Sequence, residues 1–494
     1  MVFFHETSFL KNKKIIIPAC ILFSGAGWYL AGGITGSYWW LFWLAPVPLL
    51  FVAFNVRGRQ AFFIAFIAYL IGRLSWLHYL LTVLPMALAI LFTVILPLVF
   101  ATVTVVARKM VLHSSHWSSA FAFPVLWVCF EHLGVLFSRD GTAGSIAYTQ
   151  SNFLPLIQIA SVTGIQGITF MLTFFPSAIA VALFYRKDRR MVIQLMRILA
   201  GLLIVVFTIG MARMSSSPVA TTVSVALVTI DEKNYRNVDD TDYRKQLHIT
   251  ELYLKQITAI AAKAAVVVLP EKAIIVNDST GTVIGQLFMN AAKSLHVTII
   301  AGLTKIKKDH YENNAWIISG EGKLLVDYQK VNLFEGEAME GFEPGNTIGL
   351  FYHEGTKQGI AICKDLDFQP FMNQYGKEKI GVLYVPAWDF VMDGWLHSRM
   401  AILRSVEGGY PMVRNARQGR LSISDYRGKI LYETASENKS ATVLTGAVPV
   451  AAHPTIYSKT GNWFGMLNII AAGCFIFLMG RKKTVSNIEA YSGS

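Results

Sequence analysis

The sequence predicts a helical membrane domain of about eight spans, with one α/β domain inserted before the last span. Hydrophobic residues make up 53% of the 494 residues and charged residues only 15%, a larger apolar excess than an ordinary soluble domain carries. The apolar residues are concentrated in 14–211 and 462–480, whereas 215–461 has a soluble composition. We therefore predict three parts, at 1–214, 215–461 and 462–494.

The apolar parts divide into runs of membrane-spanning length, since a helix needs about 20 apolar residues to cross a bilayer. Seven runs precede the soluble region and one follows it, at 15–32, 39–54, 61–82, 84–107, 119–137, 154–184, 194–212 and 463–480. The second run is short, and the sixth is long enough to contain a break around Gly164 and Gly167. We expect a polytopic helical domain with eight spans.

The basic residues between these runs predict the orientation of the chain. Fourteen Lys and Arg residues fall on one side of eight alternating spans, and only Arg139 and Arg213 fall on the other. Basic loops stay in the cytoplasm. Both termini are therefore expected to be cytoplasmic, with 215–461 outside the cytoplasm.

The charge distribution also argues against nucleic-acid binding. The formal net charge is +13, but 215–461 contains 26 basic and 26 acidic residues, so the whole excess belongs to the membrane parts. The soluble domain has no basic excess for a nucleic acid. Four ionisable residues inside the spans are either functional or helix-end residues that reach the interface: Arg73, His78, Glu131 and His132.

The soluble region alternates strand and helix patterns, which is typical of an α/β domain. A strand at 222–230 precedes a helix at about 241–262 and a fully apolar strand at 265–269. We then expect helices at 283–294, 367–376 and 394–408, and strands at 297–303, 314–319, 323–328, 358–363, 380–385, 411–415, 420–424, 429–433 and 441–447.

Three of these strands end in residues that carry chemistry. Glu271 follows the apolar strand 265–269, Lys330 follows the strand 323–328, and Cys363 ends the strand 358–363. Strand ends hold side chains rigidly, so such positions favour catalysis. Taken singly, however, Glu271 and Lys330 are equally explained as solvated charges.

The cysteines single out Cys363. The other three, Cys20, Cys129 and Cys474, lie inside apolar runs, so Cys363 has no partner in the soluble region. It is either inert and buried or a nucleophile, and a turn onto a helix N-terminus would favour its thiolate.

The order Glu, Lys, Cys resembles the nitrilase (carbon-nitrogen hydrolase) superfamily. Leu269-Pro270-Glu271 resembles its glutamate motif, Tyr328 to Leu333 its lysine motif with Asn332 where His is usual, and Cys363 to Phe368 its cysteine motif. A nitrilase-like domain placed between seven spans and a final one resembles the membrane-embedded apolipoprotein N-acyltransferase family. The segments Phe123 to Trp127, Pro155 to Ala160, Arg404 to Glu407 and Asn415 to Gly419 are similar to that family as well.

The resemblance implies an α-β-β-α sandwich and a role for each motif residue. Cys363 would be the nucleophile, Glu271 the general base, and Lys330 the stabiliser of the oxyanion, together with the backbone N–H of Lys364. Glu337 would be an additional active-site glutamate, with Glu335 as its competitor because the spacing from Lys330 is one residue short.

The implied reaction transfers a fatty acyl chain from a phospholipid, through an acyl-cysteine thioester, to the N-terminal amine of a diacylglyceryl-cysteine lipoprotein. It needs no cofactor or metal. The implied location is the bacterial inner membrane with the catalytic domain on the periplasmic side, and we expect a monomer. The segments 334–345 and 388–396, the latter with Trp388, are either an apolar rim facing the bilayer or ordinary buried loops.

This chain departs from the family pattern beside the nucleophile. Lys364 and Asp365 replace a Tyr-Glu pair, and Pro386 to Phe390 differs from an Asn-Asp-x-Trp-Phe motif. If Lys364 faces the site it would bind a head group, with Asp365 holding its amine; otherwise it points into solvent. Two alternatives remain, a membrane-tethered amidase or acyltransferase acting on another amine, and an inactive homologue that serves as a membrane binding module.

Overall fold

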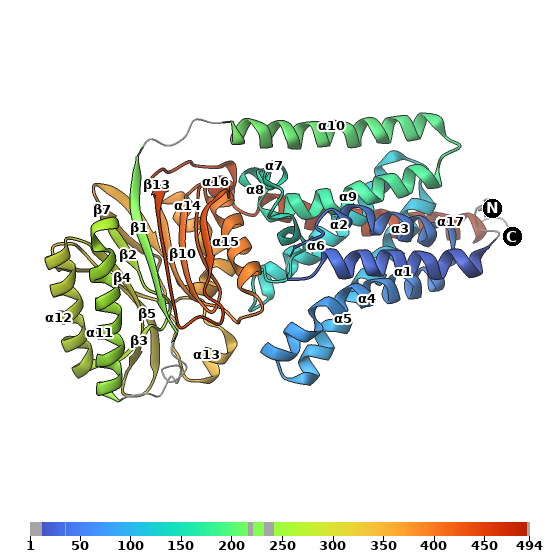
Figure 1. Ribbon diagram of the computed structural model, residues 1–494. Coiled ribbons are helices and arrows are strands. Elements are labelled where there is room, and N and C mark those ends of the chain that lie inside the picture. Colours follow the sequence, from blue (N-terminus) through green and yellow to red (C-terminus); the bar gives the residue numbers. More distant parts are fainter. Residues whose placement is uncertain (1–11, 35, 216–220, 232–241, 492–494) are drawn as a thin grey trace.

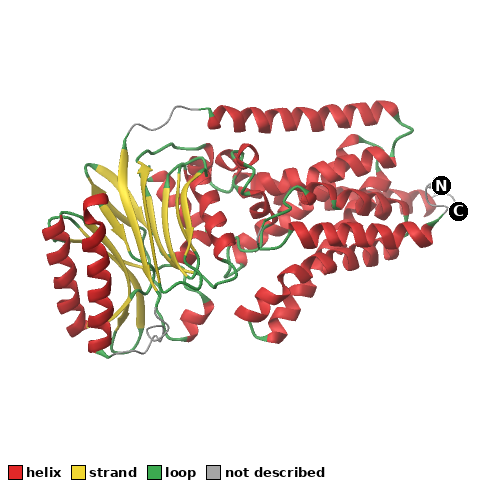
Figure 2. Ribbon diagram, viewed as in Figure 1, coloured by secondary structure: helices red, strands yellow, loops and turns green. Residues whose placement is uncertain are grey.

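The computed structural model describes residues 12–34, 36–215, 221–231 and 242–491, with side chains as far as Leu478 (Figure 1). An α/β domain lies at one end of an elongated molecule, and a bundle of helices forms the other end (Figure 2). Among the basic residues used above to predict orientation, Lys11 and the side chains of Arg481 to Lys483 lie outside the described part.

The bundle consists of apolar helices. Among the described residues, six are long and apolar enough to cross a membrane: α1 (Lys13–Ala31), α4 (Gly58–Val83), α5 (Met86–His113), α6 (Ala122–Phe137) with the 3-10 turn before it, α9 (Ile165–Phe184) and α10 (Arg189–Met214). Shorter apolar helices occupy the rest: α2 (Leu41–Leu44), α3 (Pro46–Asn55), α7 (Leu154–Ile157), α8 (Ala160–Thr163) and α17 (Trp463–Tyr491), whose described apolar part ends at Leu478. The chain is therefore a membrane protein.

The predicted break in the sixth run lies at Gly164. This residue has φ +69°, a left-handed conformation that suits glycine, and it separates α8 from α9. The carboxylate of Glu407 accepts a hydrogen bond from the N–H of Ile165 at 2.8 Å. A carboxylate from the α/β domain thus binds the N-terminus of α9, where the helix dipole favours negative charge.

Two sheets form the centre of the α/β domain. The first has the order β13-β1-β2-β4-β5-β6, with β3 also paired to β4, and the second has the order β12-β11-β10-β9-β8-β7. The first sheet comprises β1 (Thr222–Ile230), β2 (Val266–Val268), β3 (Ile274–Asn277), β4 (Thr298–Ile306), β5 (Tyr311–Ile318), β6 (Leu324–Gln329) and β13 (Ala441–Pro449). The second comprises β7 (Gly349–His353), β8 (Thr356–Ile360), β9 (Leu383–Trp388), β10 (Met412–Arg417), β11 (Arg420–Ser424) and β12 (Ile430–Ala435).

Four layers result, which confirms the α-β-β-α sandwich. Alternate apolar side chains of the two sheets, among them Val225 and Val413, meet in a shared core. The helices α11 (Tyr243–Ile260) and α12 (Asp278–Leu295) cover the outer face of the first sheet. The outer face of the second sheet is covered by α14 (Gln369–Lys377) and α15 (Gly394–Gly408).

Helix α15 also packs against the membrane helices, so both of its faces are buried. Its residues Met400 and Leu403 belong to the same core as the spans. A polar seam accompanies this contact: the Gln166 amide donates to Gln369 at 2.7 Å, and Arg404 donates to the Tyr148 hydroxyl at 3.0 Å. These buried bonds fix the α/β sandwich on the helix bundle.

The predicted elements are found at nearly their predicted positions, with two strands missed. The short strands β3 and β7 were not predicted. Helix α12 begins at Asp278, five residues before the predicted start at 283, because Asn277 caps it by accepting from the N–H groups of Ser279 and Thr280.

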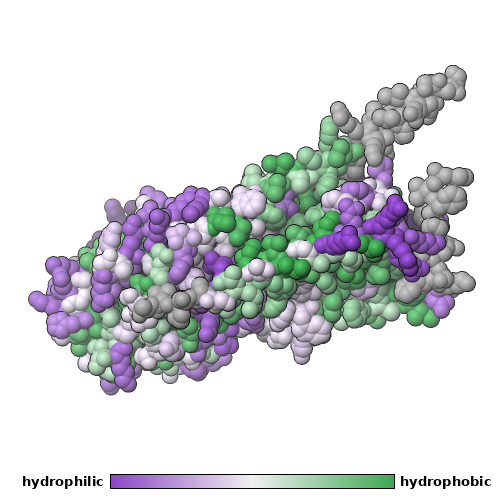
Figure 3. Space-filling model, turned by 90° about the horizontal axis from the view of Figure 1, so that it is seen from above, coloured by the Kyte–Doolittle hydropathy of each residue, from purple (hydrophilic) through white to green (hydrophobic). Residues whose placement is uncertain are grey.

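Hydropathy separates the two ends of the molecule. Hydrophobic residues cover the helix bundle, and hydrophilic residues cover the α/β domain and the opposite tip (Figure 3). The start of α1 and the turn between α9 and α10, which carry exposed basic residues, lie at that opposite tip (Figure 1). The basic loops and the α/β domain therefore lie at opposite ends of the spans.

Candidate active site

The structure brings Glu271, Lys330 and Cys363 together. Glu271 lies in the turn after β2, Lys330 directly follows β6, and Cys363 begins a 3-10 turn (Cys363–Asp367) after β8. The Lys330 ammonium lies 2.8 Å from Oε1 of Glu271, and both side chains are buried. The charges of Glu271 and Lys330 act directly on the Cys363 thiol.

Glu337 completes this cluster, and Glu335 does not. Oε2 of Glu337 lies 2.7 Å from the Lys330 ammonium, whereas Glu335 is exposed. Of the two competing glutamates, the buried Glu337 is thus the one that lies against Lys330. Glu337 also accepts from the backbone N–H of Phe334 at 2.9 Å, which fixes its carboxylate at the start of the short helix α13 (Glu335–Met339).

Two residues that the sequence analysis missed hold the glutamates. The Asn313 amide, from β5, donates to Glu271 and Glu337 at 2.7 Å each, and the Lys272 ammonium lies 2.8 Å from Glu337. Lys272 directly follows the glutamate motif. Asn313 lies in Glu312-Asn313-Asn314, a polar run within an otherwise apolar strand, which was the available signal.

Electrostatics favour the charged forms of Lys330 and Glu337 despite their burial. Burial alone would lower the pKa of Lys330, but the carboxylates of Glu271 and Glu337 raise that pKa well above its usual value. Burial opposes ionisation of Glu337 too, yet Lys330 and Lys272 hold its pKa below its usual value. Lys330 and Glu337 therefore form a buried ion pair.

The pKa of the Cys363 thiol is higher than the position of this residue before a helix suggests. Burial and the charge of Glu271 raise the pKa of the thiol well above its usual value, although Lys330 acts in the opposite direction. The expectation that a helix N-terminus favours the thiolate is therefore wrong: only a short 3-10 turn follows, and desolvation dominates. The resting thiol is protonated, and its Sγ lies 3.6 Å from the Trp388 carbonyl oxygen.

The backbone at Cys363 is strained. Its φ is +44°, which is rare outside glycine and persists only where the surroundings impose it. Asp365 supplies one such restraint, because its buried carboxylate accepts from the N–H of Ile362 at 2.9 Å and the Tyr328 hydroxyl at 2.7 Å. The same carboxylate accepts from the backbone and side chain of Asn332, so the two departures from the family motifs bind each other.

The Lys364 side chain is neither held by Asp365 nor free in solvent, the two arrangements expected from the sequence. Its ammonium lies 2.7 Å from Asp140, which belongs to the loop after α6, and it lies over the Phe334 ring at 5.4 Å. Asp365 does not hold this amine, contrary to the expectation, because its oxygens are occupied by Ile362, Tyr328 and Asn332.

A second buried ion pair, between Asp389 and Arg414, lies beside Cys363. The sequence analysis did not predict it. Asp389 binds the Arg414 guanidinium through both oxygens, at 2.9 and 2.5 Å, and lies 3.2 Å from Nδ1 of His397. The Arg414 charge lowers the pKa of Asp389 to about 2 against the effect of burial. Because Asp389 follows Trp388, this group fixes the carbonyl that contacts Cys363. Arg414 immediately precedes the recognised Asn415 motif.

The two segments expected to form either a rim or buried loops expose several large apolar side chains. The rings of Phe334 and Phe390 lie 5.7 Å apart. Met339 is 84% exposed, and Phe390 and Val391 are exposed as well. Trp388 is half-buried, with the Arg417 guanidinium 3.8 Å above its ring.

The ionisable residues of the spans have structural partners. Glu131 accepts hydrogen bonds from Trp127, Ser145, Ile146 and Thr169 at 2.8–3.2 Å. His132 is fully buried against Gln166, and the Arg73 guanidinium lies over Trp76. His78 is exposed. Of these four, Glu131 is bound most extensively.

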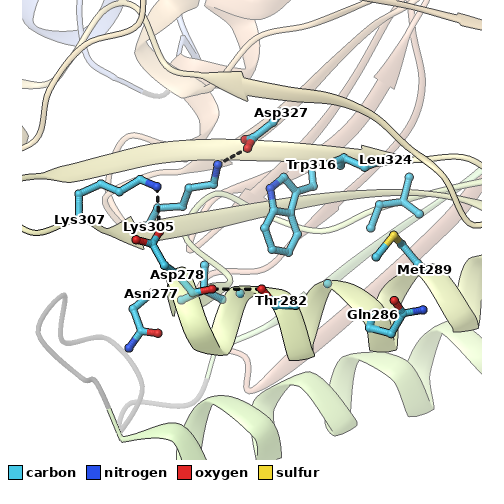
Figure 4. Close-up of a pocket in the computed structure, with 14 residues that line it drawn as sticks. Asn277, Asp278, Thr282, Gln286, Met289, Lys305, Lys307, Trp316, Leu324 and Asp327 are labelled. Atoms are coloured by element: carbon cyan, nitrogen blue, oxygen red, sulfur yellow. Dashed lines mark hydrogen bonds and ion pairs between the residues drawn. The ribbon is translucent and has the colours of Figure 1, made fainter.

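A separate cavity of about 320 Å³ lies on the outer face of the first sheet, beside α12 (Figure 4). Trp316 forms part of its wall, and the ion pairs Lys305–Asp327 and Lys307–Asp278 lie along it. Cys363 does not line it. Nor do the described residues bring together three His, Cys, Asp or Glu side chains that could hold a metal ion.

Comparison with known proteins agrees with this architecture. The model of the apolipoprotein N-acyltransferase N-terminal domain matches residues 24–178, and that of carbon-nitrogen hydrolase matches residues 224–453. The apolipoprotein N-acyltransferase of Geobacter metallireducens is 24% identical over 490 residues, which cover 90% of this chain and 92% of that protein. The chain belongs to the apolipoprotein N-acyltransferase family.

Further apolipoprotein N-acyltransferase relatives and solved structures are similar over smaller shares. Apolipoprotein N-acyltransferase 1 of Treponema denticola is 24% identical over 72% of this chain and 76% of its own length. The solved NitN amidase from Neterenkonia sp. AN1 is 17% identical, with a TM-score of 0.41 over 48% of this chain and 95% of that one.

Proposed function

We propose that this protein transfers a fatty acyl chain from a phospholipid to the N-terminal amine of a diacylglyceryl-cysteine lipoprotein, through a thioester on Cys363. The observation that carries the proposal is the cluster of buried Glu271 and Lys330 with half-buried Cys363, in a domain fixed to membrane helices. An acyl-transfer nucleophile with a carboxylate and an ammonium beside it is equipped for this chemistry.

In the first half-reaction, Glu271 takes the proton of the Cys363 thiol while the sulfur attacks the ester carbonyl carbon of the phospholipid. The Lys330 ammonium and the backbone N–H of Lys364 stabilise the negative charge on the carbonyl oxygen. When the C–O bond breaks, Glu271 returns the proton to the leaving alkoxide. The products are a lysophospholipid and acyl-Cys363.

In the second half-reaction, the lipoprotein amine attacks the thioester carbonyl. Glu271 takes a proton from the attacking amine, the C–S bond breaks, and the proton returns to the Cys363 sulfur, which restores the thiol. The two half-reactions use one pocket in turn. Glu337 keeps Lys330 in place, since both oxygens of Glu337 bind ammonium groups.

The arrangement of charges supports a location. We infer that the chain lies in the bacterial inner membrane with both termini in the cytoplasm, because its basic loops lie at the end of the spans remote from the α/β domain. The catalytic domain is then periplasmic, where lipids and lipoproteins reach it laterally from the outer leaflet. The protein acts as a monomer, because a single chain contributes all of these groups.

A reconstituted assay tests this function. Purified protein is incubated with a phospholipid carrying a labelled acyl chain and a synthetic diacylglyceryl-cysteine lipopeptide, and the products are separated by mass. The proposal predicts a lipopeptide heavier by one acyl group, together with lysophospholipid. Release of free fatty acid without acylated lipopeptide would indicate a hydrolase, and acylation of a different amine alone would replace the proposed acceptor. No reaction with either would indicate an inactive homologue.

A further inference from the structure

The loop 138–145 of the membrane domain, between α6 and the next 3-10 turn, lies directly against the catalytic turn Cys363–Asp367. The carbonyl oxygen of Asp367 accepts from the backbone N–H of Thr142 at 2.9 Å and from its hydroxyl at 2.8 Å. The far end of the catalytic turn is therefore bonded to the membrane domain.

Gly141 permits this close approach. It has φ +54°, and a Cβ placed there would overlap the carbonyl group of Asp367. A side chain at this position is thus excluded both by the backbone conformation and by the available space. The loop and the turn fit with no room between them.

The near end of the turn is held by a charge pair. The Lys364 ammonium lies 2.7 Å from Oδ1 of Asp140, and the Lys364 side chain is only 10% exposed although that of Asp140 is 57% exposed. Lys364 also carries the backbone N–H assigned above to the oxyanion. Its side chain therefore links this N–H to the membrane domain.

The loop itself is fixed inside the bundle. Glu131 accepts from the Ser145 hydroxyl at 2.8 Å and from the N–H of Ile146 at 3.2 Å. The Thr142 hydroxyl lies 2.6 Å from the hydroxyl of Tyr148, which in turn accepts from Arg404 of α15. A half-buried carboxylate in a span thus anchors the loop that contacts the catalytic turn.

We infer that Asp140, Gly141 and Thr142 are positioning residues: through Lys364 and Asp367, this membrane loop holds the nucleophile turn in its reactive geometry. The strained φ of Cys363 requires restraint from its surroundings, and Asp365 supplies it only from inside the α/β domain. The loop 138–145 supplies a second restraint on the turn, from the side of the membrane domain. The helix bundle then completes the active site in addition to anchoring it. The inference rests on the proposed acyl transfer.

The test is a double-mutant cycle on the full-length protein. Asp140→Asn removes the charge and keeps the shape, while Lys364→Met removes the ammonium and keeps the backbone N–H. We expect each single change to lower kcat for thioester formation about tenfold with an unchanged KM for the donor, because a misplaced reactive group costs rate and not binding. The double variant should be no slower than either single one, and Asp140→Glu should stay within threefold of the wild type.

Arg139→Gln, next to Asp140 and exposed, is the matched control and should react at the wild-type rate. Additive losses, an effect confined to KM, or wild-type rates in both single variants would overturn the inference. Alkylation of Cys363 by iodoacetamide, followed on its peptide by mass spectrometry, needs no lipid substrate. Slower alkylation in Asp140→Asn than in the wild type supports the positioning role, and an unchanged alkylation rate contradicts it. If the wild type transfers no acyl group, that result refutes the proposed function and leaves the alkylation test valid.

Discussion

Oε2 of Glu337 lies 2.7 Å from the ammonium of Lys330, as close to it as the base Glu271 at 2.8 Å. The Lys330 ammonium thus lies between two buried carboxylates, and Lys272 adds a second ammonium at Glu337. In the proposed reaction Cys363 passes its proton to Glu271, and the Lys330 ammonium is left beside a thiolate, which it stabilises.

Replacement of the base should block chemistry without unfolding the protein. Glu271→Gln keeps the shape and the bond to Asn313 but accepts no proton. We expect acylation of Cys363 to fall by about 10²- to 10⁴-fold, measured as lysophospholipid release in single-turnover experiments. An unchanged circular dichroism spectrum is the control, and a variant with more than half of the wild-type rate would remove Glu271 from its role.

Glu337 and Glu335 form a matched pair for a second experiment. Glu337→Gln leaves Lys330 with one carboxylate fewer in a buried site, which should cost about 2 kcal/mol of stability and slow acylation at least tenfold. Glu335→Gln, at an exposed position, should change neither quantity. Thermal unfolding and acylation rates measure both. Equal effects of the two substitutions would contradict the assignment.

The pH dependence of alkylation should report the protonated thiol. Because burial and Glu271 raise the pKa of Cys363 well above its usual value, the thiolate fraction at neutral pH is small. The iodoacetamide rate at Cys363 should therefore rise about tenfold per pH unit between about pH 7 and 9 without levelling off. Peptide mapping separates Cys363 from the other three cysteines. A plateau near neutral pH would show a resting thiolate instead.

His397 should make stability depend on pH. Burial lowers its pKa, but Asp393 and Asp389 raise that pKa to about 9. A pKa raised above the unfolded value of about 6.5 contributes stability that is complete below about pH 6.5 and is lost as the pH rises to about 9. We expect His397→Gln to be less stable than the wild type at pH 6 by about 3 kcal/mol and equally stable at pH 10. A difference in Tm that does not shrink with pH would contradict this.

That Glu271, Lys330 and Cys363 come together was predictable because each follows an apolar strand, and the sandwich places such strand ends together. The sequence pattern did not reveal the strands β3 and β7. Glu337 was separated from Glu335 only by burial, a property of the folded chain. The resting thiol was predicted wrongly, since a helix N-terminus is readily seen in sequence and desolvation is not.

The contact between Lys364 and Asp140 joins residues 224 positions apart, so no local pattern indicates it. Lys364 was visible only as a departure from a motif. The departure at Asp365 has a similar explanation, because its partner Asn332 departs from the lysine motif and the two bind each other.

Mass spectrometry of Cys363 is the most direct test for an acyl thioester on this residue. Purified protein is incubated with a phospholipid of one defined acyl chain, quenched in acid and digested, and the peptide that contains Cys363 is analysed. The proposed mechanism predicts that the mass of this peptide increases by one acyl group, and that hydroxylamine removes this group. The added mass should disappear when a diacylated lipopeptide is supplied, and it should be absent from Cys363→Ala. Formation of acylated lipopeptide while this peptide remains unmodified, or transfer by Cys363→Ala, would contradict a mechanism through the Cys363 thioester.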